Sequence, residues 1–132
     1  MPVPGSGDDG DMNGAFSRFD LLREVADAER RKPWSGGIHA RVLTKKPDFR
    51  VVLSSLETAA RLKEHHVDGT SSVQVLKGRL RYSTGGQAYD LQAGSLITLA
   101  ASIVHEVESL DESAFLLTIS WPANRKLPVS AS

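Results

Sequence analysis

The sequence lacks cysteine altogether and has no excess of charge of either sign. Across 132 residues, 16 lysines and arginines stand against 16 aspartates and glutamates, so the formal net charge is zero. Without cysteine, the chain cannot form a disulfide, a zinc finger, an iron–sulfur site or a thiol nucleophile. Without a basic surplus, it lacks the electrostatic footprint of a protein that binds nucleic acid or anionic membranes.

Long apolar runs are also missing. No uninterrupted apolar stretch approaches the roughly 20 residues that a membrane helix needs. Residues 1–14 lack the basic-then-apolar order of a signal peptide. We therefore expect a cytoplasmic protein with no membrane or nucleic-acid partner. The hydrophobic fraction of 40% is enough for one modest core.

Composition divides the chain into four segments. Residues 1–14 are rich in glycine, proline and aspartate, which predicts a disordered tail. Over residues 15–32, apolar residues recur at three- and four-residue steps between charged ones, which predicts a helix. Residues 34–122 carry the rest of the fold, and residues 123–132 form a C-terminal tail.

Short strands separated by turn residues fill the segment after the helix. Many β-branched and aromatic residues alternate with polar ones at a period of two, and the pair Gly85-Gly86 predicts a tight hairpin. Because no second helical pattern exists to cross over parallel strands, we expect an all-β sandwich or barrel with one N-terminal helix. The expected strands are 38–43, 50–56, 73–76, 79–83, 87–91, 95–99, 105–107 and 114–120.

Gly94 and His105 show the spacing that marks the second motif of the cupin superfamily. Ala100, Ser102 and Ser109 stand where that motif has proline, glycine and asparagine. The stretch therefore resembles a cupin, whose fold is a double-stranded β-helix barrel of jelly-roll topology.

The first cupin motif places two histidines, a glutamate and a glycine at fixed spacings. When its glycine is matched to Gly78, the glutamate position falls on Ser71. Four spacer residues then put Glu64 and His66 at the two histidine positions, whereas three spacer residues put His65 at the first. Adjacent strand residues point to opposite faces, so a regular strand aims only one of the two histidines into the barrel.

The resemblance covers the strand region, which is similar in sequence to small single-domain cupins of uncharacterised function. It implies a pocket in the barrel mouth in which His65, His66 and His105 are the metal ligands. Glu64 and Gln74 are expected to line that pocket, Gln74 because it interrupts an apolar strand.

Imidazole ligands suit divalent Fe, Mn, Ni, Zn or Cu, so the implied cofactor is a divalent transition metal. With a metal in place, the resemblance implies dioxygenase or isomerase chemistry. Ser71 removes the usual anionic ligand, and two alternatives therefore stay open. One is a metal-free ligand-binding or sensory barrel for a small molecule, and the other is a structural or oligomerisation domain. Since open barrels have strand edges that need covering, we expect a homodimer.

Overall fold

The fold is described from a computed structural model, which covers residues 15–122 and gives Glu64 and His65 by their backbone only. The predicted tails, residues 1–14 and 123–132, lie outside the described residues. The chain divides into two compact units, with the boundary between Pro33 and Trp34. Each unit is described by itself.

The described part of the first unit holds one helix, α1 (Leu21–Glu29), which is shorter than the predicted helix over residues 15–32. It starts where the Asp20 carboxylate accepts a hydrogen bond from the Arg23 backbone N–H at 3.2 Å. It ends where the N–H of Arg31 bonds to the carbonyl of Ala28, because this tight turn interrupts the α-helical pattern. Among residues 15–122, no helix has both the length and the apolar character that crossing a membrane requires.

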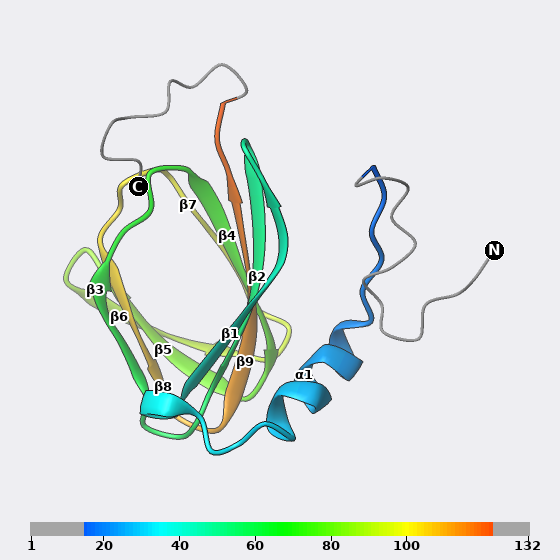
Figure 1. The fold of residues 1–132 in the computed structure, drawn as a ribbon. Coiled ribbons are helices and arrows are strands. Elements are labelled where there is room, and N and C mark those ends of the chain that lie inside the picture. Colours follow the sequence, from blue (N-terminus) through cyan, green and yellow to red (C-terminus); the bar gives the residue numbers. More distant parts are fainter. Residues whose placement is uncertain (1–14, 123–132) are drawn as a thin grey trace. The chain divides into compact units, whose positions relative to one another are not determined.

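Two antiparallel sheets form the second unit, and they face each other in Figure 1. The five-stranded sheet has the order β1-β2-β9-β4-β7, and the four-stranded sheet has the order β3-β8-β5-β6. A short 3-10 turn, η1 (Ser35–Gly37), leads into the first strand. The strands are β1 (Ile38–Lys46), β2 (Phe49–Leu56), β3 (Arg61–His65), β4 (Thr70–Lys77), β5 (Arg79–Thr84), β6 (Gln87–Gln92), β7 (Leu96–Leu99), β8 (His105–Ser109) and β9 (Ser113–Ser120).

The prediction of an all-β barrel with one helix is confirmed, but one strand, β3, was not predicted. This strand lies at the edge of the four-stranded sheet, where it pairs only with β8. An edge strand buries little, and β3 accordingly carries Arg61 and Lys63 around a single half-buried Leu62. Its charged residues hide the alternation on which strand prediction depends.

The core lies between the two sheets, and both sheets contribute to it. Strand alternation sends every second side chain inward, where it packs against the facing sheet. The five-stranded sheet supplies Leu56, Val73, Val75 and Phe115, and the four-stranded sheet supplies Leu80, Tyr82, Leu91 and Val107.

The outer face of the four-stranded sheet is charged. Arg79 and Arg81 alternate with the buried Leu80 and Tyr82, so both guanidinium groups point to solvent. This face is therefore a solvated surface. It carries the ion pairs Arg61–Glu106 at 3.0 Å, Arg81–Glu108 at 3.6 Å and Arg79–Asp90 at 3.9 Å. Exposed ion pairs of this kind contribute little stability, about 1 kcal/mol at most.

Gly78 connects β4 to β5 at a position that has no room for a side chain. Its φ is 80°, and a Cβ there would lie 2.3 Å from both the carbonyl oxygen of Glu112 and the hydroxyl of Ser113. The loop between β8 and β9 therefore closes directly over this glycine. The glycine of the first cupin motif was matched to Gly78, and the close approach gives its physical reason.

We predict that Gly78→Ala destabilises the fold by at least about 3 kcal/mol, because overpacking adds to backbone strain. Gly86→Ala is the matched control, since Gly86 has the same φ of 80° and no heavy atom within 4 Å of an added Cβ. The control should lose only about 1–2 kcal/mol, which is the cost of the backbone strain without overpacking. Urea unfolding of both variants measures the difference, and equal losses would show that the close approach is not the cause.

Candidate functional site

The candidate site is centred on His105, at the start of β8, and Tyr82 in β5. Their rings are stacked, with centroids 5.2 Å apart and planes 13° from parallel. The β5–β8 register pairs Tyr82 with Val107 and Thr84 with His105, so these side chains share the inner face of the sheet. Both aromatic side chains are buried, with 2% of Tyr82 and 8% of His105 exposed.

A backbone carbonyl orients the His105 ring. Nδ1 lies 3.0 Å from the carbonyl oxygen of Ile103. Because a carbonyl can only accept a hydrogen bond, the neutral ring carries its proton on Nδ1 and its lone pair on Nε2. His105 was predicted to be a metal ligand in the barrel mouth. Its side chain is buried beside Tyr82, and the ligand role stays a prediction.

The Tyr82 hydroxyl is the unusual polar group of this site. It is buried, and it has no hydrogen-bond partner in the part of the chain that the structure describes. Burial also raises the pKa of Tyr82 to about 12, so the hydroxyl stays protonated at neutral pH. A buried hydroxyl without a partner costs about 1–3 kcal/mol. A bound molecule that accepted a hydrogen bond from Tyr82 would remove that cost.

Two pockets flank the stacked pair, and Thr84 lines both of them. The polar pocket has a volume of about 370 Å³ and lies at the β5–β6 hairpin. The apolar pocket has a volume of about 190 Å³ and lies where β5 and β6 of one sheet face β7 of the other. The polar pocket is lined by Ser83, Thr84, Gly85, Gly86, Gln87, Ala88, Val104, His105 and Glu106, and the apolar pocket by Tyr82, Thr84, Tyr89, Leu91, Ile97, Thr98 and Leu99.

The backbone of one further predicted residue, His65, lies beside this site. The β3–β8 register pairs His65 with His105. The side chains of His65 and Glu64 lie outside the described part, so their roles in a pocket stay predictions. His66 follows the end of β3, and its side chain is exposed.

Gln74 is on the wrong face of its strand for the predicted pocket. It is exposed, whereas its neighbours Val73 and Val75 are buried in the core. Because successive side chains alternate across a strand, Gln74 lies on the outer face of β4. It interrupts the apolar run because that face is in contact with solvent.

The described side chains do not fit a metal centre. Ser71, at the glutamate position of the first motif, is buried in β4, and its hydroxyl has no partner among the described residues. Between residues 15 and 122, no three described side chains of histidine, aspartate or glutamate come together in a way that could hold a metal ion. A transition metal needs at least three such ligands at about 2.0–2.3 Å.

Two replaced residues of the second motif have structural roles. Ser102, at the glycine position, has a φ of 69°, in the left-handed region that favours glycine. Its N–H donates to the carbonyl of Val67 at 2.7 Å, which ties the segment leading to His105 to the loop after β3. The chain therefore keeps the bend of the motif without its glycine.

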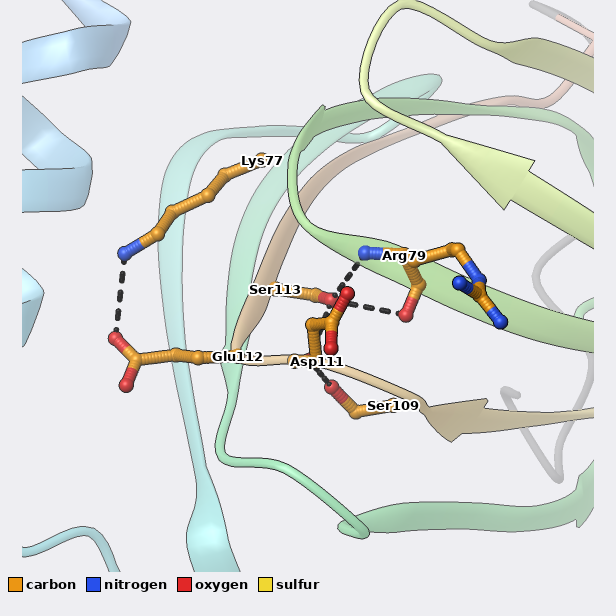
Figure 2. Close-up of polar contacts among 6 residues, drawn as sticks. All are labelled: Lys77, Arg79, Ser109, Asp111, Glu112 and Ser113. Carbon is orange, nitrogen blue, oxygen red and sulfur yellow. Dashed lines mark hydrogen bonds and ion pairs between the residues drawn. The ribbon is translucent and has the colours of Figure 1, made fainter.

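Ser109, at the asparagine position, belongs to the polar contacts drawn in Figure 2. It is fully buried, and its hydroxyl donates to the carbonyl of Asp111. Nearby, the Ser113 hydroxyl accepts a hydrogen bond of 2.9 Å from the backbone N–H of Arg79 (Figure 2). These contacts hold the β8–β9 loop against the start of β5, so Ser109 closes the barrel and does not line either pocket.

Tyr82 and Thr84 were not predicted as site residues. Arg79 and Arg81 are exposed on the outer side of β5. The same alternation points Tyr82 inward. A polar aromatic residue at an inward position, next to a predicted hairpin, was the signal that could have found it.

The raised pKa of Tyr82 predicts a loss of stability in alkali. An unfolded tyrosine has a pKa of about 10, whereas the folded value is about 12. The folded state therefore binds more protons between these values, so this contribution is complete below pH 10 and falls as the pH rises toward 12. Urea unfolding from pH 8 to 11.5 should show a steeper decline for the wild type than for Tyr82→Phe. Parallel curves would contradict the assignment.

Comparisons with solved structures show the fold. A cupin superfamily protein from Desulfitobacterium hafniense has a TM-score of 0.66 at 15% identity, over 72% of this chain and 87% of the other. KdgF from a Halomonas species has a TM-score of 0.62 at 17% identity, over 70% and 86% of the two chains. A cupin 2 conserved barrel domain protein from Leptotrichia buccalis is 28% identical with a TM-score of 0.63, over 70% of this chain and 45% of the other. A search of curated proteins finds no match.

A family model agrees with this fold and covers the site. The model described as the AraC-like ligand binding domain matches residues 47–123, more than half of the chain. The match includes Tyr82, Thr84, His105 and both pockets. The resemblance to cupins is thus confirmed, and the chain belongs to the AraC-like ligand binding domain family.

Proposed function

We propose that this barrel binds a small organic molecule, without a metal, at the site formed by Tyr82, His105 and the two flanking pockets. The observation that carries the proposal is the Tyr82 hydroxyl, which is buried and unpartnered among the described residues while its side chain lines a pocket. A side chain that served only to fill the core would be more stable as phenylalanine, because no polar group would then lose its water.

The pockets support binding by their size and chemistry. Ligand sites in proteins are concave, mostly apolar, and contain a few polar groups that fix the orientation of the ligand. Here an apolar pocket and a polar pocket meet at Thr84, with the stacked rings of Tyr82 and His105 between them. The stack is rigid because the Ile103 carbonyl fixes one ring and the core packs around the other.

A metal bound by His65, His66 and His105 is the second candidate. The observation in its favour is the pairing of the His65 backbone with that of His105. Two observations argue against a metal: His66 is exposed, and Ser71 stands where the first motif has its glutamate ligand. The homodimer expected from the open sheet edges remains a prediction beside both candidates.

Thermal unfolding in the presence of a library of small sugars, organic acids and neutral aromatic compounds tests the proposal. A ligand at about 100 times its Kd stabilises a folded protein by about 2.7 kcal/mol, which raises Tm by about 5 °C or more for a domain of this size. We expect at least one compound to do so equally with and without EDTA.

Two variants make this test specific. His105→Ala should abolish the shift because it removes the stacking partner of Tyr82, whereas His39→Ala should keep it. His39 is the matched control because it is a half-buried histidine that contacts Trp34, with ring centroids 6.1 Å apart, and lines neither pocket. A shift that EDTA removes and Zn²⁺ or Mn²⁺ restores would favour the metal candidate. Failure of the whole library would contradict ligand binding.

A further inference from the structure

We infer that the ligand of this site is an uncharged molecule with a flat apolar body and one hydrogen-bond acceptor, of the chemical class of an aryl ketone. The inference rests on the proposed function and extends it. It places the apolar body in the apolar pocket and the acceptor at the Tyr82 hydroxyl.

The size of the apolar pocket fits one aromatic ring with a short substituent. Its volume is about 190 Å³, and an apolar cavity of about 150 Å³ is enough to hold benzene. Leu91 lies on one sheet, and Ile97 and Leu99 lie on the facing sheet, so a flat body would contact aliphatic side chains on both sides. The rings of Tyr82 and Tyr89 complete an aromatic wall that favours offset stacking.

The lining of the apolar pocket argues for a neutral ligand. Its seven residues are two tyrosines, two threonines and three aliphatic residues, so it offers no charged side chain at neutral pH. Moving an anion or a cation from water into such a site costs several kcal/mol when no opposite charge pairs with it. Glu106 lines the polar pocket only, and its carboxylate already pairs with Arg61 at 3.0 Å.

The hydroxyl groups of the lining argue for an acceptor on the ligand. Thr84 already donates its hydroxyl proton to the carbonyl of Val104 at 2.9 Å. Tyr89 donates its proton to the side-chain oxygen of Gln87, also at 2.9 Å. Tyr82 keeps its proton at neutral pH because of its raised pKa, and among the described residues this proton has no acceptor. A ligand oxygen would supply that acceptor.

Three probes and two variants test this inference by isothermal titration. The probes are acetophenone, its isostere ethylbenzene without an acceptor, and the anion benzoate. The wild type should bind acetophenone about three- to tenfold more tightly than ethylbenzene, which is the net effect of one hydrogen bond. Benzoate should bind at least about tenfold more weakly than acetophenone, because its charge is not paired.

Tyr82→Phe keeps the aromatic ring and removes only the hydroxyl, so acetophenone and ethylbenzene should then bind equally. Ser55→Ala is the matched control. It also removes a buried hydroxyl that has no partner among the described residues, but Ser55 lines neither pocket, so the wild-type ratio should persist. Loss of the ratio in both variants would overturn the assignment of the acceptor to Tyr82.

The remaining outcomes separate this inference from the proposed function. Equal binding of acetophenone and ethylbenzene to the wild type would overturn the acceptor, and preferred binding of benzoate would overturn the neutrality of the ligand. Both would leave ligand binding intact. The same holds if none of the three probes binds while another compound of the library gives a shift that depends on His105. If no compound binds at all, the proposed function itself fails.

Discussion

The stack of Tyr82 on His105 connects the core of the fold to the candidate site. It lies where the two sheets face each other, so it must fill the core and also accommodate two polar groups away from water. His105 meets this requirement through the Ile103 carbonyl. The Tyr82 hydroxyl does not meet it with any described residue. The unpartnered hydroxyl makes Tyr82 a candidate for ligand binding rather than only for packing.

The two ends of β5 differ in how tightly they are packed. Before its first residue, Gly78 allows the β8–β9 loop to close over the barrel, and buried serines hold that loop with hydrogen bonds. After its last residue, the glycines of the β5–β6 hairpin leave space, and the polar pocket lies there. One strand thus connects a tightly packed end to an end that holds the polar pocket.

The sequence predicted the fold better than the site, for identifiable reasons. Period-two alternation located the strands of the core, but it failed for β3, where an edge position permits charged residues. Motif spacing pointed to His105, which is buried at the start of β8, because spacing reflects the path of the backbone. The interruption of an apolar run misplaced Gln74, since an isolated polar residue in such a run marks either an outer face or a pocket. Whether a hydroxyl such as that of Tyr82 finds a partner depends on the facing sheet, and no local pattern encodes this.

Elemental analysis of the untagged protein tests the central claim most directly, because a metal-free barrel and a metal centre differ in composition. If the site recognises its ligand through Tyr82 and His105 alone, the protein should carry less than about 0.1 equivalent of Fe, Mn, Ni, Zn or Cu per chain. A content close to one ion per chain in the wild type, lost in His105→Ala, would contradict the account and make this barrel a metal centre.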